Sequence, residues 1–251
     1  MIGNRFEEFT GIVRRLRKEC PWDREQTNDS IKASTIEEAY EVVEAIDSKN
    51  YNELKKELGD LLLHVVFHTT IAEEENHFNL NDVIESIKEK LIRRHPHVFG
   101  NTEVTGVEHV KRNWEAMKLK EGRKSVIDGV PVSLPALQRA HRLQEKASKV
   151  GFDWERKEDV WKKVEEELSE IKNAGTDKEE IEKEFGDLLF SLVNYARFIG
   201  INPENALRRT NEKFVKRFQY VEEKINESGR KISESNLKEM DKYWEESKAL
   251  L

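Results

Sequence analysis

The amino-acid sequence predicts an all-α protein made of two similar helical domains in tandem. Charged residues form 37% of the chain and are dominated by glutamate and lysine, which favour long solvated helices over sheets. Five prolines and 12 glycines in 251 residues leave few breaks in those helices. One six-residue pattern occurs twice, as E-L-G-D-L-L at 57–62 and as E-F-G-D-L-L at 184–189. Such self-similarity indicates an internal repeat.

The repeat extends in both directions from this pattern. Three more pairs of segments align between the copies: 37–41 with 166–170, 90–94 with 213–217, and 113–115 with 243–245. Glycine and proline gather between the copies, at the density expected of a connector. The sequence therefore predicts a first domain at 1–118, a linker at 119–135 and a second domain at 136–251.

Each copy is predicted to contain four or five helices. In the second copy, apolar residues recur at helical spacing between Val160 and Ile171. The G-T-D sequence at 175–177 then supplies a turn and an N-cap for a helix predicted over 181–199. Two helices joined so closely form an antiparallel hairpin, and the first copy repeats the layout.

The second helix of each hairpin has two distinct faces. In the second copy, an apolar stripe comprises Ile181, Phe185, Leu188, Leu192 and Ile199. The other face comprises Glu184, Asp187, Ser191, Asn194 and Phe198. Both faces are expected to be at least partly covered, which places the acids where the helix enters a core.

Four carboxylates of each copy are predicted to converge. Residues at i and i+3 lie on one side of a helix, so the hairpin brings E-E-x-x-E and E-x-x-D together. The two sets are Glu167, Glu170, Glu184 and Asp187 in the second copy, and Glu38, Glu41, Glu57 and Asp60 in the first. Oxygen ligands suit Mg²⁺, Mn²⁺ or Ca²⁺, and the lack of a Cys/His pattern argues against structural zinc. A solvated acidic face is the alternative for one cluster alone, and repetition favours a metal site.

Basic and aromatic residues accompany both acidic sets. Pairs at i, i+4 are Lys90 with Arg94 and Lys213 with Arg217, and each pair suits phosphate oxygens or a solvated basic stripe. Trp114 and Trp244 are candidates for stacking on a base, or for core packing.

Net charge and cysteine usage exclude several classes of protein. A net charge of −7 argues against binding a nucleic-acid polymer. The single Cys20 cannot form an internal disulfide, and no run of 18 apolar residues occurs. We expect a soluble, cytoplasmic chain with no membrane partner.

Several motifs together resemble the MazG nucleoside triphosphate pyrophosphohydrolases in their tandem-domain form. In the first copy they are C-P-W-D at 20–23, E-E-A-Y-E at 37–41, E-L-G-D-L-L at 57–62 and R-H-P-H-V-F-G at 94–100. In the second they are S-L-P-A-L at 133–137, G-F-D-W at 151–154, E-F-G-D at 184–187 and N-E-K-F at 211–214. The resemblance covers nearly the whole chain and is specific as a set.

This resemblance implies a fold, a reaction and a set of site residues. The fold is the helical bundle of all-α NTP pyrophosphohydrolases, which usually form homodimers and use Mg²⁺. The reaction is hydrolysis of NTPs and dNTPs to the monophosphate and pyrophosphate, with broad base tolerance. By resemblance, Glu167, Glu170, Glu184 and Asp187 hold the metal, and Lys163, Lys183, Lys213, Arg217 and Trp244 contact nucleotide. Glu166 is a candidate acceptor of the water proton.

Two other functions stay open at this point. One is a non-catalytic module whose acidic clusters bind a metal or a basic partner. The other is a selective phosphatase for damaged nucleotides, since the motifs fix the bond broken better than the base accepted.

The second copy is expected to carry most of the activity. In the first copy, Pro96 ends the basic helix soon after Arg94, and the acids at 73–75 lengthen the loop after the second helix. These acids are expected to repel a triphosphate. His64 also stands where the second copy has Ser191.

Overall fold

The computed structural model of the chain describes residues 2–107, 109–110, 113–114, 117 and 125–250. Every regular element in these residues is a helix, which confirms the predicted all-α class. Contacts divide the chain into two compact units, Met1–Thr105 and Gly106–Leu251. Part of the predicted linker lies outside the described residues, so the boundaries at 118 and 136 stay a prediction.

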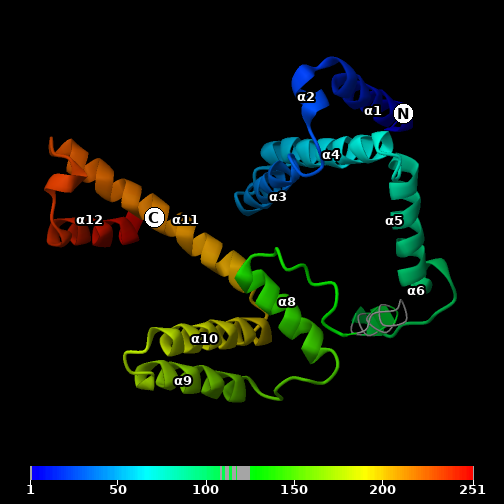
Figure 1. Ribbon diagram of the computed structural model, residues 1–251. Coiled ribbons are helices and arrows are strands. Elements are labelled where there is room, and N and C mark those ends of the chain that lie inside the picture. Colours follow the sequence, from blue (N-terminus) through cyan, green and yellow to red (C-terminus); the bar gives the residue numbers. More distant parts are fainter. Residues whose placement is uncertain (1, 108, 111–112, 115–116, 118–124, 251) are drawn as a thin grey trace. The chain divides into compact units, whose positions relative to one another are not determined.

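The first unit is built on the long helix α4, which packs against α1 and α3 (Figure 1). Its helices are α1 (Ile2–Glu19), α2 (Pro21–Glu25), α3 (Lys32–Asp47), α4 (Tyr51–Glu74), α5 (Leu80–Arg94) and α6 (Pro96–Phe99). Its buried core comprises Val13, Ile31, Val66, Phe67 and Ile71. The core therefore lies at the C-terminal half of α4, and the acidic half of that helix lies outside it.

The second unit contains the predicted hairpin. Its helices are α8 (Ala136–Ser148), α9 (Lys157–Asn173), α10 (Lys178–Phe198), α11 (Pro203–Glu227), the 3₁₀ helix η1 (Ile232–Glu234) and α12 (Leu237–Leu250). Helices α9 and α10 pack side by side (Figure 1). Gly175 takes φ 70°, where a Cβ is unfavourable, and the Asp177 side chain accepts from the Glu179 N–H as the N-cap. Both predicted turn signals are confirmed.

On α10 the polar face is more buried than the apolar stripe, contrary to what hydrophobicity alone suggests. Glu184, Ser191 and Asn194 are buried, whereas Phe185 is 52% exposed and Leu192 is 39% exposed. Helices α8 and α9 both pack against α10, with α9 as its partner in the hairpin. A row of exposed large apolar side chains is costly in water and indicates a surface that binds another surface.

The loop expected to carry extra acids is instead the end of a helix. Helix α4 continues to Glu74, so Glu73 and Glu74 are helical. Arg14 lies 3.0 Å from Glu73 and Arg17 lies 3.0 Å from Glu74. At about 1.5 Å of rise per residue, Glu73 is some 20 Å along α4 from Asp60. The assignment of Glu73 and Glu74 to a loop was therefore wrong, and their expected repulsion of a triphosphate stays a prediction.

The break after the basic helix is confirmed, because α5 ends at Arg94 and α6 begins at Pro96.

Of the helices described, none combines the length and the apolar character needed to cross a membrane.

Candidate functional site

Three carboxylates meet between α9 and α10. One oxygen from each of Glu167, Glu184 and Asp187 lies within 4.8 Å of the other two. Glu167 and Glu184 are buried, whereas Asp187 is exposed to solvent. Because the hairpin sets E-E-x-x-E opposite E-x-x-D, the positions of these oxygens follow from helical geometry. An oxygen-only donor set of this kind fits a divalent cation such as Mg²⁺.

Two lysines lie against this acidic triad. Lys163 Nζ is 2.6 Å from Glu167 and 2.7 Å from Glu166, while Lys183 Nζ is 2.9 Å from Glu184. Hydrogen bonds to these carboxylates raise the pKa of both lysines. The hydrogen bond from Lys183 is also the main cause that lowers the pKa of Glu184. The site therefore holds fixed positive charge beside its carboxylates, which suits a phosphate chain.

Glu170 and Glu166 lie at the edge of the triad. Desolvation raises the pKa of Glu170, and a hydrogen bond with Glu167 raises it further. Glu170 is exposed and adjoins the triad without belonging to it. The Glu166 carboxylate is paired with Lys163 and half exposed, so it is open to water.

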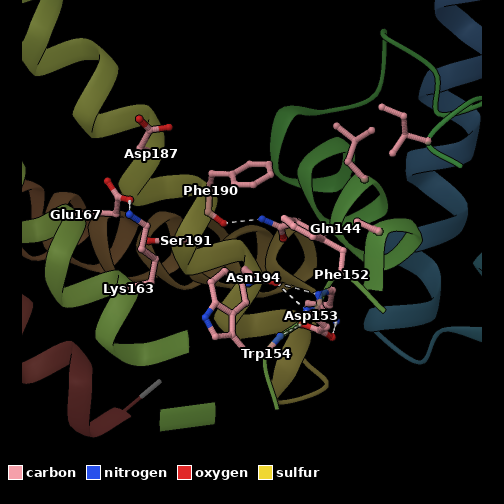
Figure 2. Close-up of a pocket in the computed structure, with 14 residues that line it drawn as sticks. Gln144, Phe152, Asp153, Trp154, Lys163, Glu167, Asp187, Phe190, Ser191 and Asn194 are labelled. Carbon is pink, nitrogen blue, oxygen red and sulfur yellow. Dashed lines mark hydrogen bonds and ion pairs between the residues drawn. The ribbon is translucent and has the colours of Figure 1, made fainter. Parts of the chain in front are cut away.

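A cavity of about 400 Å³ adjoins the triad (Figure 2). Helices α8, α9 and α10 and the segment 152–154 line it, and Lys163, Glu167 and Asp187 lie on its wall. Arg197 donates to Asp153 at 2.9 Å and to Asn194 Oδ1 at 2.8 Å. This clamp fixes the segment 152–154 to α10. The volume matches that of small-molecule sites in proteins.

The other predicted nucleotide contacts lie on a different pair of helices. Lys213 and Arg217 belong to α11, and Trp244 belongs to α12, which packs on α11. The Arg217 guanidinium is 5.9 Å from the Trp244 ring centroid, and Phe214 lies 5.2 Å from the same ring. Neither Lys213, Arg217 nor Trp244 lines the cavity beside the triad. Among the described residues, these three side chains and the triad therefore do not line this cavity together.

The first unit holds a similar cluster between α3 and α4. Oxygens of Glu38, Glu41 and Glu57 lie within 4.8 Å of one another, and Asp60 stands outside this group. Desolvation raises the pKa of both Glu38 and Glu57, and neighbouring carboxylates add to the rise. This cluster is therefore short of positive charge.

One substitution between the repeats explains the difference. Ser34 occupies the position in the first copy that Lys163 occupies in the second. Lys56 aligns with Lys183 but lies 2.7 Å from Glu53. Within the described residues, no lysine or arginine lies within 4 Å of the carboxylates of the first cluster. The difference between Ser34 and Lys163 is visible in the sequence, but an alignment of the acidic residues alone does not reveal it.

Two histidines connect the first cluster to the core. Thr35 Oγ1 lies 3.0 Å from His64 Nδ1 and 2.8 Å from His68 Nε2, and His68 Nδ1 lies 2.7 Å from Asn28 Oδ1. His64 Nε2 is 3.9 Å from Glu38. Burial lowers the pKa of His68.

We expect His68 to make the first unit less stable in acid. Its pKa is lower in the folded chain than in the unfolded chain, so the unfolded chain binds the proton better. The free energy of unfolding is therefore expected to fall as the pH drops below about 6.5, the ordinary histidine value. Urea unfolding between pH 7.5 and 5 should show a shallower fall in His68→Gln than in wild type. His77→Gln, at an exposed position, is the control, and an identical slope in all three proteins would refute the expectation.

Comparison with known proteins places these features in a family context. Residues 26–99 and 157–222 each match the model of the MazG nucleotide pyrophosphohydrolase domain. A Thermotoga maritima protein named nucleoside triphosphate pyrophosphohydrolase/pyrophosphatase MazG is 50% identical, over 97% of this chain and 95% of its own length. An Escherichia coli nucleoside triphosphate pyrophosphohydrolase is 41% identical, over 98% of this chain and 97% of its own. The uncharacterized protein YabN of Bacillus subtilis is 46% identical over 99% of this chain and 52% of its own length.

Proposed function

The chain belongs to the MazG family of nucleotide pyrophosphohydrolases, and on this premise we propose that it hydrolyses nucleoside and deoxynucleoside triphosphates at the α–β phosphoanhydride bond. The products are the nucleoside monophosphate and pyrophosphate, and the reaction tolerates different bases. The observation that carries the proposal is the acidic triad with two lysines at one end of a nucleotide-sized cavity. This arrangement provides cation ligands, phosphate contacts and space for a nucleoside together.

The metal in this proposal is Mg²⁺, with Mn²⁺ as a substitute. Glu167, Glu184 and Asp187 are its ligands, and Glu170 joins them through its contact with Glu167. When bound, the cation neutralises phosphate oxygens and stabilises the charge that develops on the leaving pyrophosphate. The donor set is all oxygen, as Mg²⁺ requires.

The lysines and Glu166 have separate tasks in the proposal. Lys163 and Lys183, now paired with Glu167 and Glu184, would contact phosphate oxygens if a bound cation compensated those carboxylates. Glu166 then loses its pairing with Lys163 and is the group we assign as acceptor of the water proton. Its half-exposed position leaves room for that water.

We further propose that the active form is a homodimer. The exposed apolar stripe of α10 needs a cover, and Phe185 and Leu192 are part of it. Lys213, Arg217 and Trp244, the other proposed nucleotide contacts, are not among the residues that line the cavity beside the triad. A second copy that lays its α11 and α12 against the α9–α10 hairpin would cover the stripe and bring these contacts to the triad.

The first unit has a supporting role in this proposal. Its cluster of Glu38, Glu41 and Glu57, with Asp60 nearby, keeps the ligands for a cation but lacks the counterpart of Lys163. Its nearby Lys56 is paired with Glu53, so the cluster has less positive charge than the second unit to hold a triphosphate. We assign it a structural or regulatory cation site.

A substrate panel tests the reaction. The full chain is incubated with each common NTP and dNTP, with Mg²⁺ or with EDTA, and both products are measured. Monophosphate and pyrophosphate in equal amounts, with Mg²⁺ only, are expected. Release of single phosphates instead would show that another bond is cut.

Added Mg²⁺ is expected to raise the melting temperature. A ligand at 100 times its Kd stabilises the folded state by about 2.7 kcal/mol. For a unit of this size, that corresponds to a rise of roughly 5–10 °C. Calorimetry of Glu184→Gln with Asp187→Asn should show a smaller rise, while Glu182→Gln on the exposed side of α10 should match wild type. Equal rises in all three proteins would exclude the triad as the metal site.

A further inference from the structure

A buried acceptor without a partner lies in the wall of the cavity that adjoins the acidic triad. Gln144 of α8 is 8% exposed, and its Oε1 has no hydrogen-bond partner among the described residues. Gln144 lines the cavity (Figure 2). An unsatisfied buried carbonyl oxygen is destabilising, and a native structure seldom retains one without a reason.

The orientation of the Gln144 amide is fixed by its other end. Its Nε2 donates to the backbone oxygen of Phe190 at 2.8 Å. A backbone oxygen only accepts hydrogen bonds, so the nitrogen must face Phe190 and the oxygen must face away from it. The unpaired group is therefore an acceptor, which requires a donor from a ligand.

Aromatic residues supply the rest of the wall on this side. Phe152 and Trp154 line the same cavity, and Phe152 is 81% exposed. Because almost nothing packs on Phe152, its ring can shift or stack on a ligand without loss of core contacts. The clamp from Arg197 to Asp153 and Asn194 holds the backbone between the two aromatic residues in place. A flat ligand with an N–H on its edge fits these features.

We propose that Gln144 Oε1 accepts an N–H of the substrate's nucleobase, and that Phe152 and Trp154 contact the ring. The inference rests on the proposed function: the nucleoside occupies the end of the cavity at α8, and its phosphates extend to Lys163 and Asp187. Adenine, guanine, cytosine, uracil and thymine each carry an N–H on the pairing edge. A single acceptor therefore tolerates every base but still distinguishes a nucleotide from a sugar phosphate.

Binding of product analogues tests this without turnover. Calorimetry with Mg²⁺ compares UMP, ribose 5-phosphate and N3-methyluridine 5′-monophosphate, whose base has no N–H. Wild type is expected to bind UMP about 10-fold more tightly than the methylated nucleotide, the effect of one buried hydrogen bond. Ribose 5-phosphate should bind more weakly still.

Variants at two glutamines of α8 isolate the amide. Gln144→Met keeps the side-chain length and should reduce the affinity for UMP about 10-fold, with ribose 5-phosphate unaffected. Its melting temperature should change little, since removal of the unpaired acceptor offsets loss of the hydrogen bond to the Phe190 oxygen. Gln138→Met makes the same change outside the cavity and should bind like wild type.

The outcomes separate this inference from the proposed function. The inference would be overturned if Gln144→Met preferred UMP over ribose 5-phosphate as strongly as wild type does. It would also be overturned if wild type bound UMP no more tightly than it binds either analogue. Absence of pyrophosphate release from every NTP would instead refute the proposed function, whatever the result with UMP.

Discussion

Replacing Glu184 and Asp187 together with alanine is expected to lower kcat/KM by at least about 100-fold, the scale of losing electrostatic stabilisation at a reacting phosphate. Glu184 and Asp187 each contribute one carboxylate oxygen to the acidic triad between α9 and α10. The fold should remain intact, because relief of repulsion among the clustered carboxylates offsets loss of the ion pair between Lys183 and Glu184. Pyrophosphate release and thermal unfolding measured on the same preparation separate loss of chemistry from loss of structure.

The matched control is the same double change in the first repeat. Glu57→Ala with Asp60→Ala should keep most of the pyrophosphate release, because that cluster has no counterpart of Lys163. Equal halving by each pair would mean that both units hydrolyse. The reverse order of effects would show that the roles of the two units are exchanged.

Mixing two inactive variants is expected to restore about a quarter of the wild-type activity. One variant carries Asp187→Asn, and the other carries Lys213→Ala with Arg217→Ala. If a second copy supplies the basic residues, a mixed dimer contains one intact site, and random exchange makes about half of the dimers mixed. Activity after subunit exchange, measured over hours, reports this directly.

A second mixture decides whether the effect has this cause. Asp187→Asn mixed with Glu184→Gln should stay inactive, because both changes fall in the carboxylate half of the site. Activity in that mixture would show that mixing restores turnover without a site shared between two subunits. No recovery in the first mixture, with exchange shown by labelled subunits, would mean that each chain completes its own site.

Local signals in the sequence predicted the hairpin well. The cap at Asp177 and the turn at Gly175 appear as expected, because both depend on a few neighbouring residues. The acids come together because helical spacing and one short turn determine where they point. Three of the four predicted carboxylates of the second copy form the triad, and Glu170 adjoins it.

Features that depend on distant packing were not predictable in the same way. The apolar stripe of α10 suggested a core, yet Phe185 is exposed in the single chain, since the cover of a stripe depends on what binds it. Glu73 was assigned to a loop because the acidic residues around it do not indicate that the helix continues. In the structure Glu73 pairs with Arg14, which lies 59 residues away in the sequence, and a local pattern cannot show such a contact. Gln144 gave no signal at all, because an unpaired amide is visible only once its surroundings are known.

If the proposed cation sites are correct, the difference between Lys163 and Ser34 would determine in which form each repeat accepts a cation. In a cell, Mg²⁺ exists partly as the free ion and partly bound to nucleotide, and the nucleotide complex is a net anion. The cluster in the first unit, where Lys56 is paired with Glu53, would attract the free ion more readily than the anionic complex. The cluster in the second unit, flanked by Lys163 and Lys183, would accept the complex as a whole. On the proposed function, two copies of one hairpin in the same chain would therefore respond to two different quantities: the first to free Mg²⁺ and the second to the amount of nucleotide that carries it.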